Sequence, residues 1–301
     1  MRKIAALSVL LWVSPGLSSI KAESFFPDPN LDAAVRKQMF AGDKMTEDDL
    51  KKLSTIKATG AGIRDLSGLE KCTSLAALDL ADNQIADLIP LKGLTNLQSL
   101  TLSSNKIQDI SPLSGLTNLQ YLELSRNEIS AITSLGKLTQ LSALYLSGNR
   151  FSNIDAIQNL DKLSSLYLDG NKVSELKPLA NIRNLSSLDI SGNRVSDLTP
   201  ISNMKDLRYL SLDNNRLSDL EPLVVMSKKD FEGEKRFAPY LFLAVNGNPL
   251  NAAAKVQLAE LKGYGVRLEP VKPVTISHKS VDAQKATAAS SKRNPSTQTK
   301  K

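Results

Sequence analysis

The apolar positions of this chain recur every 22 residues over most of its length. Seven successive units place Leu, Ile, Val, Phe or Met at the same seven slots. The units begin at Leu75, Leu97, Leu119, Leu141, Leu163, Leu185 and Leu207. A repeat of this period indicates a solenoid, in which each turn buries its apolar side chains against the neighbouring turns.

The spacing of the apolar slots changes within each unit. Leu100 and Leu102 flank a polar residue, as in a short strand with one face turned inward. Apolar positions three residues apart, such as Ile107 and Ile110, suit a 3₁₀-like return path. We therefore expect an α/β solenoid: a right-handed superhelix with a parallel β-sheet on its concave side, 3₁₀ or irregular segments on its convex side, and helical caps.

An asparagine occupies the same place in every unit. Inside the turn, its amide can hydrogen-bond backbone groups that no strand partner reaches. The predicted structural ladder is Asn83, Asn105, Asn127, Asn149, Asn171, Asn193, Asn215 and, after a longer turn, Asn248. A degenerate turn precedes these units, with Ala61 in place of the asparagine and Cys72 in an apolar slot. Cys72 is interpreted as a buried small hydrophobe, with a reactive thiol as the alternative.

The repeat L-x-x-L-x-L-x-x-N-x-I-x-D-L-x-P-L-x-x-L-T-N, seen at 97–118, resembles the 22-residue leucine-rich repeats of bacterial internalins and of phosphatase-regulatory repeat proteins. The resemblance covers about 25–269. It implies the leucine-rich-repeat fold, and it says little about function, because such repeats occur in proteins that share only the property of binding something.

Residues 23–52 are predicted to form a helical N-terminal cap. Asp28 and Pro29 begin a helix, and Thr46 opens a second helix with a sequence close to a capping box. The sequence Phe-Pro-Asp-Pro-Asn-Leu resembles the cap that precedes repeats in bacterial proteins of this type.

The repeats are expected to span 53–250, in about nine turns, followed by a C-terminal cap over 251–269. The last turn carries an insertion at about 227–239, interpreted as a tolerated surface segment or as a second contact site. After it, the core pattern is expected to resume at Tyr240, and an amphipathic cap helix over 252–262 is expected to bury Val256, Leu258 and Leu261.

Both ends of the chain differ from the repeats. Arg2 and Lys3 precede an apolar run, Ile4 to Val13, which predicts a signal peptide over 1–22; a buried strand or helix is the alternative. The run is too short for a transmembrane segment. Residues 270–301 hold seven Lys or Arg against Asp282 alone and few large apolar residues, which predicts a disordered basic tail.

The net charge of +7 therefore comes from the two ends of the chain, 1–22 and 270–301. The tail carries +6, whereas 23–269 holds 28 basic and 30 acidic residues, a net charge of −2. The repeats themselves are slightly acidic.

The sequence offers no catalytic set. His278, the single histidine, lies in the tail, and no metal-binding spacing or phosphate loop is present. We expect no enzyme activity, no cofactor and no metal. Most carboxylates recur at one repeat position, with a basic residue three places earlier in several turns, and this pattern is interpreted as a surface charge ladder. These carboxylates are Asp65, Asp87, Asp109, Glu175, Asp197 and Asp219.

The residues between the inward leucines predict a ligand-binding concave face. Its candidate residues are Tyr121, Glu123, Tyr145, Tyr167, Asp169, Asp189, Tyr209 and Asp213. Tyrosines anchor interfaces at low entropic cost, and the acids favour a neutral to basic protein or peptide. A glycan is the second choice, because tyrosines also stack on sugars. The alternative is that exposed strand positions simply favour aromatic residues.

Three functions follow from these features. The first is an exported scaffold, secreted or extracytoplasmic (periplasm or cell surface), that binds a protein or peptide through its concave face. The second is an envelope-associated structural protein whose tail contacts acidic polymers without specific nucleic-acid recognition. The third is an intracellular regulator of the phosphatase-regulator type, which the predicted signal peptide disfavours.

Overall fold

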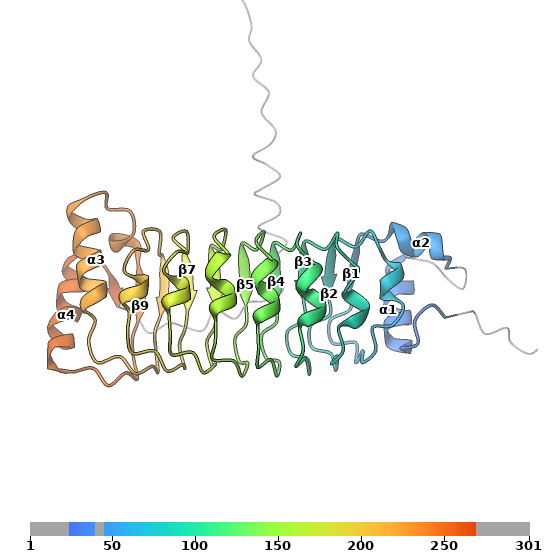
Figure 1. The fold of residues 1–301 in the computed structure, drawn as a ribbon, viewed down its shortest axis with the longest axis horizontal. Coiled ribbons are helices and arrows are strands. Elements are labelled where there is room, and N and C mark those ends of the chain that lie inside the picture. The colour runs from blue at the N-terminus through green and yellow to red at the C-terminus, as the bar shows by residue number, and fades with distance from the viewer. Residues whose placement is uncertain (1–23, 40–44, 269–301) are drawn as a thin grey trace, which may run out of the picture.

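The structure is a computed structural model that describes residues 24–39 and 45–268 (Figure 1). The predicted signal peptide and the basic tail lie outside these residues. Two helices, α1 (Pro29–Met39) and α2 (Glu47–Lys52), come first. The strands are β1 (Thr55–Lys57), β2 (Ala77–Asp79), β3 (Ser99–Thr101), β4 (Tyr121–Glu123), β5 (Ala143–Tyr145), β6 (Ser165–Tyr167), β7 (Ser187–Asp189), β8 (Tyr209–Ser211), β9 (Phe242–Ala244) and β10 (Arg267–Leu268).

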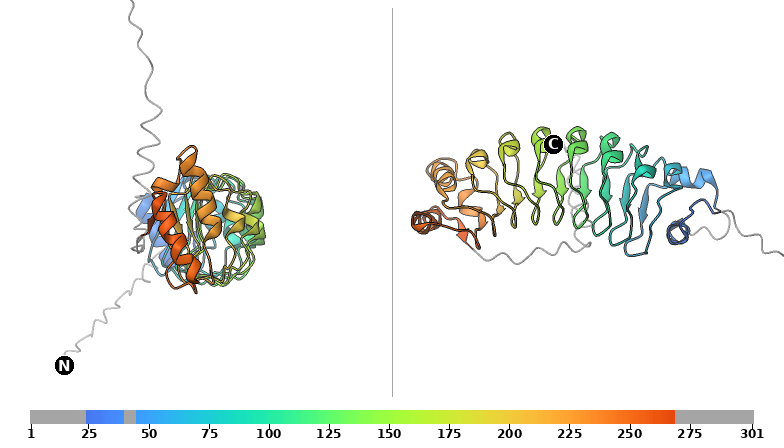
Figure 2. Two further views of the ribbon diagram at one scale, coloured as in Figure 1. Left: turned by 90° about the vertical axis from the view of Figure 1, so that its left-hand side faces the viewer. Right: turned by 60° about the horizontal axis from the view of Figure 1, so that its bottom comes forward.

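All ten strands form one parallel sheet in sequence order. From β1 to β8 each residue pairs with the residue 22 positions later, as Leu100 does with Leu122. The sequence period therefore sets the register of the sheet. Figure 2 shows the turns following one another along a curved stack, which confirms the predicted leucine-rich-repeat solenoid.

The return path of most turns contains a short 3₁₀ segment. These segments are η1 (Leu69–Lys71), η2 (Ile89–Leu91), η3 (Ser111–Gly115), η4 (Thr133–Lys137), η5 (Asp155–Asn159), η6 (Lys177–Leu179), η7 (Thr199–Ile201) and η8 (Ala238–Tyr240). The repeated carboxylates accept backbone hydrogen bonds at the start of several of these segments. Asp109 accepts the Ser111 N–H at 2.8 Å, and Asp197 accepts the Thr199 N–H at 2.8 Å. The interpretation as a charge ladder was therefore incomplete, because these side chains satisfy backbone donors at the start of the 3₁₀ segments.

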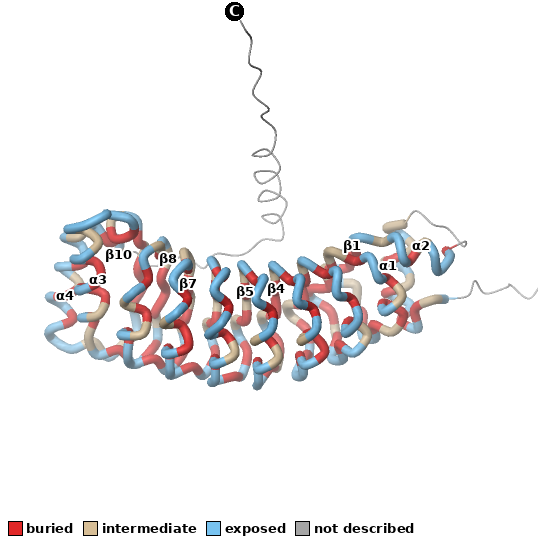
Figure 3. The backbone as a smooth tube through the Cα atoms, turned by 45° about the horizontal axis from the view of Figure 1, so that its top comes forward, coloured by how far each residue is buried: buried red, intermediate tan, exposed pale blue. Residues whose placement is uncertain are grey.

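The apolar slots of the repeat form one continuous core. The buried residues, red in Figure 3, lie on the inner side of every turn from the N-terminal helices to α4 (Ala252–Gly263). Cys72 is fully buried among them, and this burial raises the pKa of its thiol to about 12. Its environment is that of a small hydrophobic side chain.

The repeated asparagines link adjacent turns, and they are buried from Asn83 to Asn215 and partly buried at Asn248. Asn127 donates from Nδ2 to the carbonyls of Leu102 and Leu124, both at 3.0 Å, and its Oδ1 accepts the Ile107 N–H at 3.1 Å. Asn149 also donates to the Leu124 carbonyl. Each such carbonyl is thus shared by two successive asparagines, so the hydrogen bonds form an unbroken series, the asparagine ladder, from Asn83 to Asn248.

The residue before each ladder asparagine has a left-handed backbone. It is glycine in some turns, such as Gly170 with φ of 66°, and a side-chain residue in others, such as Arg126 with φ of 57°. A left-handed residue costs about 1–2 kcal/mol unless it is glycine. The turn geometry is therefore kept even where the sequence does not favour it.

A buried carboxylate joins the N-terminal cap to the repeats. Asp28 accepts the N–H groups of Asn30 and Leu31 at the start of α1, and those of Arg64 and Asp65 in the first turn. Burial alone would raise the pKa of Asp28, but these four hydrogen bonds together lower it.

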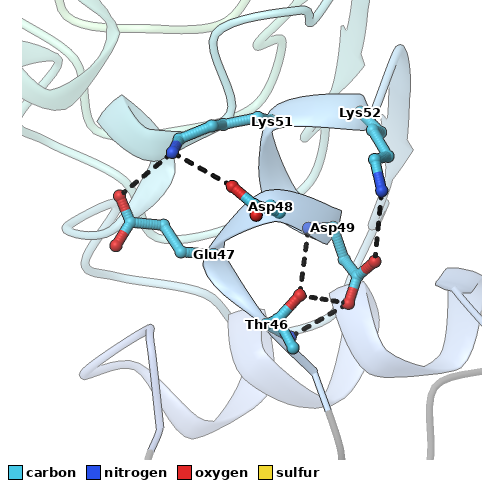
Figure 4. A network of polar contacts seen from close by, with 6 residues as sticks. All are labelled: Thr46, Glu47, Asp48, Asp49, Lys51 and Lys52. Atoms are coloured by element: carbon cyan, nitrogen blue, oxygen red, sulfur yellow. Dashed lines mark hydrogen bonds and ion pairs between the residues drawn. The ribbon is translucent and has the colours of Figure 1, made fainter.

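The second cap helix starts with a complete capping box (Figure 4). The Thr46 hydroxyl accepts the Asp49 N–H at 3.3 Å, and the Asp49 carboxylate accepts the Thr46 N–H at 3.1 Å. Lys51 pairs with Asp48 at 3.3 Å on the exposed side. The helix places Leu50 in the core.

The enlarged last turn differs from the expectation in two ways. Its helix, α3 (Glu221–Glu232), begins six residues before the predicted insertion, where other turns have a 3₁₀ segment, and the inserted residues lengthen it. Tyr240 is 54% exposed, and Leu241 takes the core position instead. The predicted core slot was wrong by one residue there, because η8 includes Tyr240 and ends directly before Leu241 and β9.

The C-terminal cap helix buries Leu261 and packs Leu258 against the core as expected, but it exposes Val256. In α4, Val256 is 60% exposed, while Ala254, Gln257 and Leu261 are buried. Gln257 takes the buried place next to Val256, where its Oε1 accepts the Leu220 N–H at 2.7 Å and its Nε2 donates to Glu221 at 3.1 Å. A polar side chain thus fixes how α4 packs on α3.

Candidate binding face

Four tyrosines lie in a row across the sheet. The ring centroids of Tyr121 and Tyr145 are 5.4 Å apart, those of Tyr145 and Tyr167 are 5.0 Å apart, and those of Tyr167 and Tyr209 are 6.2 Å apart. Two of these pairs are stacked, with interplanar angles of 24° and 20°. We call these rings, with Glu123, Asp169, Asp189 and Asp213, the tyrosine face.

The row results from two different strand positions. Tyr121 and Tyr209 are the first residues of β4 and β8, whereas Tyr145 and Tyr167 are the last residues of β5 and β6. The row is continuous across β7 because that strand carries Ser187, which leaves room for the rings on either side.

The carboxylates of the face are held by hydrogen bonds. Asp189 accepts the Tyr209 hydroxyl at 3.1 Å and the Ser191 hydroxyl at 2.6 Å. Asp169 accepts the Ser147 hydroxyl of the preceding turn. Asp213 accepts the Asn246 N–H at 2.6 Å. These acids are therefore fixed in position before any ligand arrives.

Glu123 is placed differently from the other acids. Only 7% of its surface is exposed, and its carboxylate accepts the Ser125 N–H at 2.8 Å. It pairs across the sheet with Tyr145. A ligand on the face would contact the tyrosine rings, and the buried Glu123 would act on it only through its negative charge.

Burial governs the ionisation of the face. It raises the pKa of Tyr145 to about 12, aided by the negative charge that Tyr167 acquires at alkaline pH and by that of Glu123. Burial likewise raises the pKa of Tyr121, Tyr167 and Tyr209. The phenols are therefore neutral near pH 7 and act as hydrogen-bonding aromatic surfaces.

Asp169 also has a raised pKa, first because of burial and then because of the charge of Asp189. The hydrogen bond from Ser147 and the charge of Arg126 oppose this rise. A cation placed between Asp169 and Asp189 would relieve the repulsion between the two carboxylates.

The C-terminal end of the row already holds a cation on an aromatic ring. Phe242 follows Tyr209 in the register of the sheet, and the Arg267 guanidinium lies 5.0 Å from its centroid. Arg208 lies 4.9 Å from the centroid of Tyr240 nearby. These contacts show that the rings at this end accept guanidinium groups.

The sequence placed all eight candidate residues on the sheet side, and the structure brings the four tyrosines into mutual contact. Sequence reasoning missed the contact of Arg267 with Phe242. The signal was present in the pairing of a basic residue with an aromatic one in adjacent strands, but the closing strand is only two residues long.

Other potential sites are few in the described chain. Residues 24–39 and 45–268 contain no group of His, Cys, Asp and Glu side chains arranged to hold a metal ion. No helix within those ranges combines the length and apolar character that crossing a bilayer requires. A small cleft beside α3 is lined by Met204, Met226 and Phe237 together with charged residues.

The repeats match known families. Residues 73–129 and 95–151 match the family described as "Leucine rich repeat", and residues 183–224 match "Leucine Rich repeats (2 copies)". The solved structure of an internalin (InlF) from Listeria monocytogenes superposes with a TM-score of 0.72 and 28% identity, covering 83% of this chain and 71% of that chain. Internalin C2 from the same species gives a TM-score of 0.65 and 35% identity, covering 66% of this chain and 89% of that one.

The fold and these matches define the chain as a leucine-rich-repeat protein. Its repeats are of the bacterial internalin type. Internalin H of Listeria monocytogenes is 36% identical over 96 residues, which cover 27% of this chain and 17% of that relative. The chain therefore matches only a small part of this relative's length.

Proposed function

We propose that this protein is an exported scaffold that binds a neutral to basic protein or peptide segment on the tyrosine face. The observation that carries this proposal is the row of four contacting tyrosine rings across β4 to β8, bordered by fixed carboxylates. The membership of the chain among internalin-type repeat proteins, a class of binding scaffolds, supports it.

The face suits such a segment for physical reasons. Each tyrosine offers a large ring with few rotatable bonds, so little side-chain entropy is lost on binding. The rings are already packed against one another, which lowers the cost of ordering them further. Carboxylates beside aromatic rings favour Lys and Arg side chains, whose stems pack on the rings while their charges meet the acids.

Export is supported by the predicted signal peptide at 1–22. Purifying the protein from its native host and sequencing its N-terminus tests this part of the proposal. Cleavage near Ala22, together with recovery outside the cytoplasm, is the expected result. An intact Met1 on protein recovered from the cytoplasm would reject export and would favour an intracellular role.

Binding can be tested with short linear peptides in basic, neutral and acidic sets, measured by calorimetry against the full chain. We expect basic and neutral sequences to bind and acidic ones not to bind. The double variant Tyr145→Ala/Tyr167→Ala should weaken binding by at least tenfold, since each buried aromatic anchor contributes about 1–2 kcal/mol or more.

Ile89→Ala is the matched control, because Ile89 is an exposed apolar residue in η2, away from the sheet. It should bind like the unaltered chain. Equal weakening by both variants, or binding that is unchanged in the double tyrosine variant, would reject the tyrosine face as the binding site.

A further inference from the structure

We propose that the basic segment of this same chain, residues 270–301, occupies the tyrosine face when no partner is bound and competes with the partner for it. This inference rests on the proposed function for the identity of the shared site. It assigns a specific occupant to a surface that is otherwise open in the described residues.

Charge complementarity is the first argument. The segment carries six lysines and Arg293 against Asp282, whereas the face presents Asp169, Asp189 and Asp213. The basic residues are Lys272, Lys279, Lys285, Lys292, Arg293, Lys300 and Lys301. The opposite charges of the two regions attract at the ionic strengths of ordinary buffers, and salt weakens that attraction.

The place where the chain leaves the sheet is the second argument. Since all strands are parallel, their C-terminal ends lie along one edge. β10 ends at Leu268 on that edge, and Asp169 and Asp213 follow β6 and β8 at the same edge. The strand before the basic segment therefore ends at the same edge as these carboxylates, two strands away from β8 and four from β6.

Its length also suits the distance. Six strand spacings of about 4.8 Å separate β10 from β4, a span of roughly 29 Å. A random coil of 32 residues, the length of this segment, would have an r.m.s. end-to-end distance of about 31 Å. When the chain length matches the span, a tethered ligand reaches its highest effective concentration, on the order of millimolar. Even weak contacts by the tail would then fill the face for much of the time.

The contact of Arg267 with Phe242 is the third argument. It lies at the C-terminal end of the aromatic row, one residue before the end of β10, and places a cation on the ring that follows Tyr209 in register. The next cations along the chain would continue this contact onto the tyrosine rings and their carboxylates.

A zero-length coupling reagent, which joins a lysine amine to a carboxylate in direct contact, tests the inference on the full-length chain. At low salt we expect links from the tail lysines to Asp169, Asp189 or Asp213 within monomers, identified by mass spectrometry. High salt should abolish them. Asp87 and Asp109 are the matched carboxylates on the return path, and they should not be linked. Links spread equally over both sets, or no links at all, would overturn the inference.

Competition is measured with two tail variants of the full chain. One replaces the six lysines and Arg293 by glutamine, and the other replaces the lysines by arginine, which keeps the charge. A peptide of lysine, arginine and glycine is the probe. We expect it to bind about fivefold more tightly to the glutamine variant, as expected if the tail occupies the face about four-fifths of the time. The arginine variant should bind like the unaltered chain.

Equal affinity for all three chains would overturn the competition. If none of the chains binds any peptide, the proposed function fails, and the linking experiment still decides by itself whether the tail lies on the face.

Discussion

The asparagine ladder and the tyrosine face both run along the stack of turns, and they differ in how much each turn repeats. The ladder keeps the same residue from Asn83 to Asn248, because its side chains satisfy buried backbone groups that recur in every turn. The face changes from strand to strand, with Tyr145 and Tyr167 beside Asp189 at one position. The backbone requires the same residue at the ladder position of every turn. The residues of the tyrosine face can differ from turn to turn without leaving a buried backbone group unsatisfied.

The largest effect is expected in the ladder. Asn149→Ala removes hydrogen bonds to the carbonyls of Leu124 and Leu146 and leaves the buried Ile129 N–H without its acceptor. We expect a loss of about 3 kcal/mol in the free energy of unfolding, measured by urea titration.

Asn171 provides a matched control for that prediction. Its Nδ2 donates in the same way, but its Oδ1 has no hydrogen-bond partner, and Phe151 fills the slot that Ile or Val holds in most turns. Asn171→Ala should therefore cost about 1 kcal/mol less than Asn149→Ala. Equal losses would show that the Oδ1 acceptor contributes nothing to the ladder.

A smaller effect is expected in the face. Tyr145→Ala removes two ring contacts, at 5.4 and 5.0 Å, from a partly exposed side chain. The free energy of unfolding should fall by about 1.5 kcal/mol. Tyr145→Phe keeps both ring contacts and should change the free energy of unfolding by less than about 0.5 kcal/mol. A larger loss in the free energy of unfolding for Tyr145→Ala than for Asn149→Ala would contradict the distinction between the asparagine ladder and the tyrosine face.

The residue with a left-handed backbone before each ladder asparagine should tolerate substitution better than the asparagine itself. In Gly170→Ala the new Cβ would lie 3.5 Å from the Gly148 nitrogen, an ordinary contact, so only the left-handed φ of 66° opposes it. We expect a loss of about 1 kcal/mol by urea titration. A loss as large as that of Asn149→Ala would indicate that glycine is structurally required at this position, although Arg126 occupies the equivalent place two turns earlier.

The last effect appears only at alkaline pH. The fold raises the pKa of Tyr145 to about 12, against about 10 for an exposed tyrosine, so it favours the neutral phenol. The stability linked to this residue is therefore complete below about pH 10 and is lost as the pH rises towards 12. Absorbance titration of the folded protein should show phenols that ionise well above pH 10. The variant Tyr145→Phe should show one fewer of them. Ionisation of every phenol near pH 10 while the fold persists would contradict this.

The 22-residue period was sufficient to predict the parallel sheet, its register and the buried slots, because each turn repeats the same local requirement. It failed at Tyr240, where η8 directly precedes β9 and no neighbouring turn repeats the pattern. In the cap helix, the amphipathic pattern was right for Leu261 and wrong for Val256, since Gln257 takes the buried place and hydrogen-bonds Leu220.

The individual tyrosines could be assigned to the sheet. The contact of Tyr145 with Tyr167 follows from the register of the sheet, since the two residues pair directly. The other two contacts could not be predicted, because each joins the first position of one strand to the last position of another, and that of Tyr167 with Tyr209 spans Ser187.

The neighbour-only pairing of the sheet has a mechanical consequence. Each strand from β2 to β9 bonds only to the strands before and after it in sequence, so a pull on the two ends is carried by the turns in series. A turn that opens from one end leaves the rest of the stack intact. It lengthens the molecule by up to about 73 Å, the reach of 22 extended residues. Stretching a single molecule should therefore give a sawtooth of evenly spaced extensions, with the wider turn that contains α3 as its one unequal step.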